Sequence, residues 1–152
     1  MRLALTDLFR AKWSNQIHDE WIRGVLRNRN DISLAQLNRT KELMNANIRD
    51  CLVEDYQDLI PAIRSGASYI ITYNLKDFPA AELAKYDLSP QHPDEFVLNQ
   101  IDLNAAKVCE AVRNQRQALR NPPCSQDQLL DIYLRSGLVS SVAELRKWKH
   151  AF

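Results

Sequence analysis

Two polar side chains directly follow the best candidate for a β-strand in this sequence. Residues 68–73 (SYIITY) are rich in aromatic and β-branched residues, and Asn74 and Asp77 come immediately after them. Ligands of parallel α/β sheets bind just beyond the carboxyl ends of the strands. A carboxylate and an amide oxygen there would suit Mg²⁺ or Mn²⁺. Asn and Asp also cap turns and short helices routinely, and spacing alone favours that structural role.

A third candidate residue and second carboxylate, Glu20, lies in the segment HDEW at residues 18–21. On a helix it falls opposite or at the edge of the apolar stripe, so the residues alone favour a solvent-exposed side chain over a metal ligand. His18 has no second His or Cys at ligand spacing, which argues against zinc. His92, in QHPDEF, fits a turn better than a catalytic base. The sequence has no nucleophile elbow, phosphate loop or dinucleotide-binding glycine motif.

Basic residues are concentrated in two parts of the chain, and each is able to contact phosphates. The first group comprises Arg23, Arg27, Arg29, Arg39, Lys41 and Arg49, and the second comprises Arg113, Arg116 and Arg120 at helical spacing. The net charge of the chain is only +1. Solvated helix faces therefore explain both groups better than a dedicated nucleic-acid surface does.

Length and composition indicate an ordinary globular protein. The 152 residues suit one domain with a core of its own. The three cysteines, Cys51, Cys109 and Cys124, form no CxxC pair, which favours free thiols in a reducing compartment. No apolar stretch approaches the roughly 20 residues that span a bilayer, and the first residues do not form a signal peptide. We therefore expect a cytoplasmic protein.

The first third of the chain predicts three helices. Apolar spacing indicates a first amphipathic helix that ends near Lys12, Ser14 is a candidate cap for the second, and Ser33 with Gln36 forms a candidate capping box for the third. The expected inward faces of the last two are Ile17, Trp21, Ile22, Val25 and Leu26, and then Leu34, Leu37, Leu43 and Met44.

The rest of the chain alternates short strands with helices and then becomes helical. The expected elements are a strand at 51–53, a helix at 57–65 ended by Gly66, a strand at 68–73 buried on both faces, a helix at 79–83, a strand at 87–90, a helix beginning at Pro93, and helices at 104–119, from Ser125 to Gly137 and from Ser141. The Asn121-Pro122-Pro123 segment is the clearest linker.

Three parts of the sequence together resemble a known family. They are LFRAKWSNQIHDEWIRGVLRNR near the start, SYIITYNLKDFP with QHPDEF in the middle, and NPPCSQDQLLDIYLRSGLVSSVAELR near the end. In this order they resemble a bacterial branch of the PIN-domain superfamily, the compact α/β ribonucleases that include the VapC-like toxins of toxin–antitoxin pairs. The resemblance implies an α/β, PIN-like three-layer fold that is rich in helices. It would have a small, reduced parallel sheet and a C-terminal helical appendage.

The resemblance also implies a metal-binding acid cluster made of distant parts of the chain. Glu20 and Asp77 would be the ligands of Mg²⁺ or Mn²⁺, and Asn74 would complete the catalytic set, with Thr72 orienting the pair. Two acidic parts of the family pattern have no counterpart here. One is an aspartate on a strand before the first helix, and the other is an acidic segment before Ile63. We therefore expect weak or no binding of metal.

The resemblance leaves three functional hypotheses open. The chain is a PIN-like ribonuclease relative with weak or no activity alone, a non-catalytic module that binds an antitoxin or another subunit, or part of a longer and ordinary ribonuclease. The expected partners are RNA, a cognate antitoxin and further copies of the chain, since loss of a central strand exposes a sheet edge. The expected division is an incomplete PIN-like domain at 1–121 and a helical extension at 122–152.

Overall fold

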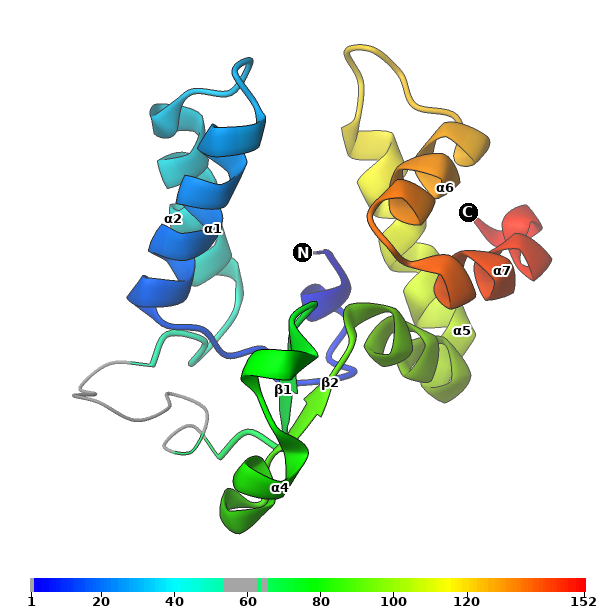
Figure 1. The fold of residues 1–152 in the computed structure, drawn as a ribbon. Coiled ribbons are helices and arrows are strands. Elements are labelled where there is room, and N and C mark those ends of the chain that lie inside the picture. The colour runs from blue at the N-terminus through cyan, green and yellow to red at the C-terminus, as the bar shows by residue number, and fades with distance from the viewer. Residues whose placement is uncertain (1, 54–62, 64–65) are drawn as a thin grey trace. The chain divides into compact units, whose positions relative to one another are not determined.

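The computed structural model describes residues 2–53, 63 and 66–152, which form two compact units. The helical unit comprises Arg10–Ser68, and the α/β unit comprises Met1–Phe9 with Tyr69–Phe152. Figure 1 shows the ribbon, and each unit is described here by itself. No helix in the described ranges is long and apolar enough to cross a membrane.

The helical unit is built on the two helices α1 (Asn15–Asn28) and α2 (Leu34–Asn47), which pack against each other. Both predicted caps are confirmed. The Ser14 hydroxyl accepts a hydrogen bond from the backbone N–H of Ile17 at 3.2 Å, and Ser33 forms a reciprocal capping box with Gln36. Each cap satisfies backbone donors that a helix start leaves without partners.

The predicted apolar faces of these helices are only partly correct. Ile22 and Leu37 are buried as expected, but Ile17 is 45% exposed, and Leu34 and Leu43 are each 52% exposed. His18 takes the buried position next to Ile17 and has no exposed surface. At 51–53 the predicted strand is reduced to a single parallel bridge between Trp13 and Leu52.

The α/β unit contains a two-stranded parallel sheet of β1 (Tyr69–Ile71) and β2 (Ser89–Gln91). Tyr69 lies opposite Ser89 in the register. The crossover between the strands consists of η2 (Leu75–Asp77), α4 (Ala80–Leu83) and η3 (Ala84–Tyr86). The strand and short helix predicted at 68–73 and 79–83 are therefore present with shorter bounds, and the second strand lies slightly later than the predicted 87–90.

The prediction that the first strand is buried on both faces is wrong. Tyr69 is 56% exposed and Ile71 is 40% exposed. The buried core of this unit lies among its later helices and leaves these side chains of the strand exposed. The apolar run predicted a strand correctly but did not predict what would cover it.

The prediction of an N-terminal helix that ends near Lys12 is also wrong. Only the short 3₁₀ helix η1 (Arg2–Leu5) forms, and Asp7 has a left-handed backbone with φ of +57°. An α-helix cannot continue through that conformation. η1 packs against the long helix α5 (Pro93–Ala118), with Phe9 and Phe96 in edge-to-face contact at 4.8 Å between ring centroids.

Helix α5 begins at Pro93 as predicted, and Asn104 interrupts it with non-helical angles. The Asn104 side chain accepts a hydrogen bond from the backbone N–H of Lys107 at 3.0 Å, so it caps the second half of the helix. This agrees with the separate helix expected at 104–119. The helix expected at 57–65 lies, apart from Ile63, outside the described residues, whereas Gly66 has the expected left-handed φ of +63°.

The C-terminal helices α6 (Gln126–Arg135) and α7 (Val139–Lys147) complete the α/β unit, followed by η4 (Lys149–Ala151). Ser125 and Gln128 form the expected capping box. α7 begins at Val139, so the prediction that Ser141 opens it is wrong. α7 packs against both α5 and α6 (Figure 1).

One core joins α5 to the C-terminal helices. Its buried members are Ile101, Val108, Cys109, Val112, Leu129, Leu130, Val142, Leu145 and Phe152. Residues 122–152 thus share their apolar core with α5. The division of the chain into a domain at 1–121 and an extension at 122–152 stays a prediction. The helix-rich α/β fold with a small parallel sheet is confirmed.

Candidate functional site

Asn74 and Asp77 lie together at the carboxyl end of β1. The Asn74 side-chain amide donates a hydrogen bond to the Asp77 carboxylate, and the backbone N–H of Asn74 donates to the Thr72 hydroxyl at 3.1 Å. Asn74 precedes η2, but its side chain makes no capping bond to that helix. The structure brings Asn74 and Asp77 together and gives the Asn74 side chain no capping bond to η2, while the site roles of Thr72, Asn74 and Asp77 stay predictions.

The end of β2 lies beside this pair. The backbone N–H of Thr72 donates to the carbonyl of Gln91 at 3.0 Å, which extends the sheet pairing to the residue after β1. Tyr73 then contacts the ring of His92 edge to face, with 5.2 Å between centroids. The polar residues that follow both strands consequently share one end of the sheet, as expected for parallel strands.

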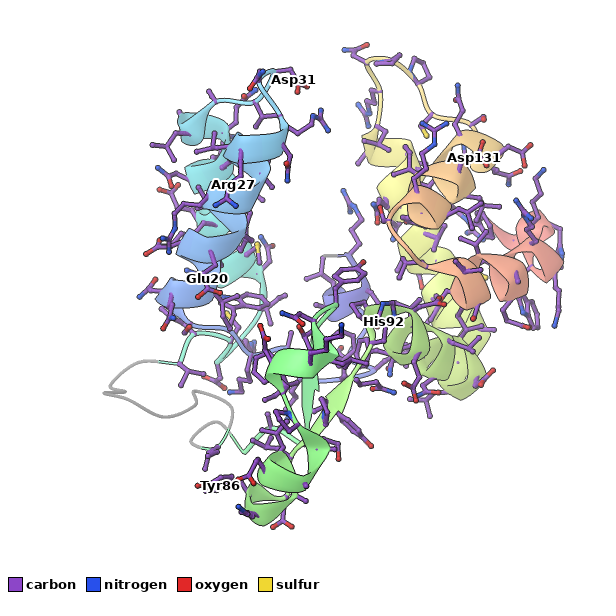
Figure 2. The ribbon with its side chains drawn as sticks, viewed as in Figure 1. Glu20, Arg27, Asp31, Tyr86, His92 and Asp131 are labelled. Carbon is purple, nitrogen blue, oxygen red and sulfur yellow. The ribbon has the colours of Figure 1, made fainter. Side chains whose placement is uncertain are left out.

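His92 has a structural role at this end of the sheet. Its Nδ1 atom accepts a hydrogen bond from the backbone N–H of Asp94 at 3.1 Å, which caps the first turn of α5. Figure 2 shows His92 where β2 joins α5. His92 is therefore the N-cap residue of α5.

Asp94 is the residue that sequence reasoning missed at this end of the sheet. Its two carboxylate oxygens accept hydrogen bonds from the backbone N–H groups of Ser140 and Ser141, each at 2.8 Å, and its backbone carbonyl accepts one from the Ser141 hydroxyl. Burial alone would raise the pKa of Asp94, but the hydrogen bonds from Ser141 and Ser140 outweigh burial and lower it. No local signal predicts this contact, because its partners lie more than 40 residues away.

Glu20 lies on an exposed part of α1 in the helical unit. Its carboxylate accepts a hydrogen bond from the Gln16 side chain at 3.1 Å, one helical turn earlier. Figure 2 shows Glu20 and Arg27 projecting from the same helix. Asn74 and Asp77 belong to the α/β unit. That Glu20 shares one metal site with them remains a prediction.

His18, also on α1, belongs to a buried polar network that connects both helices of its unit. Trp21 Nε1 donates to His18 Nδ1 at 2.9 Å, while His18 Nε2 and Trp13 Nε1 both lie within hydrogen-bonding distance of Asn45 Oδ1, at 3.0 and 2.7 Å. An indole N–H can only donate, so His18 Nδ1 is an acceptor and the ring proton is on Nε2. Asn45 Oδ1 therefore accepts both bonds. His18 holds the helices together and is not placed as a zinc ligand.

Two of the candidate basic residues, Arg29 and Arg113, make defined contacts in the described structure. Arg29 forms a two-point ion pair with exposed Asp31, and the hydrogen bond from Arg29 lowers the pKa of Asp31 to about 2. The Arg113 guanidinium donates to the carbonyl of Ala151. Arg113 thus links α5 to the last residues of the chain.

The three cysteines are free thiols, as expected. Cys51 and Cys109 are buried, and burial raises the pKa of each thiol. Among the residues that the structure describes, no group of three or more His, Cys, Asp and Glu side chains is close enough to hold a metal ion.

Comparison with known proteins indicates the class to which this architecture is related. The VapC50 C-terminal domain family matches residues 93–147, which form α5, α6 and α7. Over these residues the chain is similar to that C-terminal domain, and this similarity supports a relation to the VapC-like PIN-domain proteins.

One relative is the Mycobacterium tuberculosis (strain ATCC 25618 / H37Rv) protein named "Putative ribonuclease VapC50". The chain is 36% identical to it over 78 residues, which cover 51% of this chain and 46% of that protein. The match therefore spans about half the length of its relative. Comparison with solved structures finds no significant match.

Proposed function

We propose that the chain is a metal-dependent ribonuclease relative of the toxin–antitoxin type, with weak or no activity on its own. The observation that carries this proposal is the Asn74–Asp77 pair at the shared end of the two strands. The name of its relative supplies the reaction class, hydrolysis of RNA phosphodiesters. The carboxylate and amide oxygens of the pair are chemically suited to Mg²⁺ or Mn²⁺.

The proposed metal ligands are Asp77 and Glu20, with Asn74 beside them. A divalent cation held there would supply an activated water and polarise the scissile phosphate. Asp77 and Asn74 are both exposed, so a phosphate group can reach them. Asn74 would hold the Asp77 carboxylate in one orientation.

Weak activity is supported by the role of Asp94. This acid also follows a strand, but both of its carboxylate oxygens bind the first turn of α7. It is therefore committed to the fold and is not free to join Asp77 on a metal. Because Mg²⁺ needs several convergent charges, we expect weak binding and a rate at least about a thousandfold below that of a complete PIN enzyme.

The second candidate function is a non-catalytic module that binds an antitoxin or another subunit. Its support is the exposure of Tyr69, Ile71 and Leu75 around the sheet, since clustered apolar surface is typical of protein interfaces. RNA, an antitoxin and further copies of the chain remain the proposed partners, in a cytoplasmic setting.

An RNA-cleavage assay with Mn²⁺ tests the proposed function. We expect slow cleavage that excess chelator abolishes and that Asp77→Ala abolishes as well. The matched control is Asp131→Ala, which removes an exposed carboxylate from α6 (Figure 2) and should leave the rate unchanged. Robust metal-dependent cleavage that survives Asp77→Ala contradicts the assigned site. Complete absence of cleavage favours the binding module.

A further inference from the structure

Tyr73 connects the polar pair to the C-terminal helices. Its hydroxyl donates to the backbone carbonyl of Ser136 at 2.8 Å, although the two residues are 63 positions apart. Ser136 caps the C-terminal end of α6, and a methyl group placed at Gly137 would lie 3.5 Å from the Tyr73 ring. The residue before Asn74 therefore rests on the turn between α6 and α7.

These contacts restrain the chain on each side of the pair. Thr72 is held by the backbone of Gln91, Tyr73 by Ser136 and by the edge-to-face contact with His92, and Asn74 by the Thr72 hydroxyl. Carbonyls at the C-terminal end of a helix lack intrahelical partners, so the Tyr73 hydroxyl also satisfies a backbone acceptor at the end of α6. Tyr73 is nevertheless 61% exposed, so it adds little to the buried core.

We propose that Tyr73 is a positioning residue, through which the turn between α6 and α7 sets the orientation of Asn74 and Asp77. The effect of Tyr73 on catalysis rests on the proposed function. Its effect on the orientation of Asn74 and Asp77 does not. The turn lies within residues 93–147, the part that matches the VapC50 C-terminal domain family. The inference gives that region a direct part in shaping the site.

The first test observes the pair by NMR of the ¹⁵N-labelled full chain. Tyr73→Phe keeps the ring and removes the hydroxyl, and we expect it to shift the side-chain amide resonances of Asn74. Tyr73→Leu should shift them further. The control is Tyr86→Phe, which removes the hydroxyl of a tyrosine on η3 that is 45% exposed. The melting temperature should change by only about a few degrees for each phenylalanine variant.

The second test separates positioning from binding in the cleavage assay. Tyr73→Phe should lower kcat about tenfold with little change in KM, because a misplaced group loses stabilisation of the transition state. If the Asn74 resonances shift in the Tyr73 variants but the native chain cleaves no RNA, the positioning inference is supported and the binding module is favoured over the ribonuclease. If the Asn74 resonances stay unchanged in both Tyr73 variants, the inference is overturned.

Discussion

Asp94 and Ser141 form two hydrogen bonds with each other, and in each bond the side chain of one residue contacts the backbone of the other. The Asp94 carboxylate accepts a hydrogen bond from the Ser141 backbone N–H at 2.8 Å, and the Ser141 hydroxyl donates to the Asp94 backbone carbonyl at 2.8 Å. Asp94 lies in the first turn of α5 and Ser141 in the first turn of α7. A charged group of one helix thus caps another helix, where the positive end of the helix dipole also favours it.

Replacing Asp94 should make the α/β unit less stable and less sensitive to acid. The hydrogen bonds lower the folded-state pKa of Asp94 below its usual 3.8, so its contribution to stability is present above that value and lost as pH falls below it. Asp94→Asn should cost about 1–3 kcal/mol at neutral pH, the range for losing a cap with charge-assisted bonds. Urea unfolding at several pH values measures both effects.

The control for this experiment is Asp131→Asn, which changes an exposed acid on α6. It should leave the pH dependence of the native chain in place. A native-like acid profile in Asp94→Asn would show that other acids dominate the loss of stability at low pH.

Removing His18 should destabilise the helical unit. His18→Ala leaves the Trp21 N–H without its acceptor and opens a cavity between α1 and α2, at a cost of about 2–4 kcal/mol. Tryptophan fluorescence is a suitable measurement, since Trp13 and Trp21 both flank the His18 ring. His150→Ala, at an exposed position near the end of the chain, serves as the matched control. Equal stability of the two variants would contradict the role assigned to His18.

Glu20 and Asp77 should behave as one unit if they hold the same metal ion. Glu20→Gln and Asp77→Asn should each reduce Mn²⁺-dependent cleavage, and the double variant should be little worse than the more severe single variant. Glu42→Gln, on the exposed side of α2, controls for a general effect of losing an acid. Strictly multiplicative losses in the double variant would place the two carboxylates in separate roles.

Self-association should depend on the exposed strand β1. Lysine at Ile71 introduces a charge on a side chain that is 40% exposed, so the monomer should tolerate it while pairing of strands between copies should not. Light scattering at roughly tens of micromolar protein, an ordinary working concentration, is expected to give an oligomer for the native chain and a monomer for Ile71→Lys. A clean monomer for the native chain speaks against this expectation.

Local features of this protein were predictable because their causes lie within one helical turn. Ser14, Ser33 and Ser125 each cap a helix a few residues away, and Pro93 begins α5 where its missing N–H costs nothing. The pairing of Asn74 with Asp77 spans three residues and follows a strand that its β-branched residues specify. Short-range geometry brings such groups within reach of each other.

The resemblance to PIN-like proteins added what local patterns did not contain. No spacing rule relates the segment around Glu20 to the segment around Asp77, and only the order of the quoted segments indicated the class. The comparisons support that class through residues 93–147 and through one relative. The roles of Glu20, Asn74 and Asp77 in binding metal remain proposals.

The sequence alone determined where most helices begin, which segment forms the first strand and which class of protein this chain resembles. Only the tertiary structure decided that Asp94 caps α7, that His18 is buried and that Tyr73 reaches Ser136. These contacts join residues far apart in the chain, or depend on which face of a helix a neighbour covers. Their free energy comes from packing and desolvation in the folded state, which no local pattern of residues records.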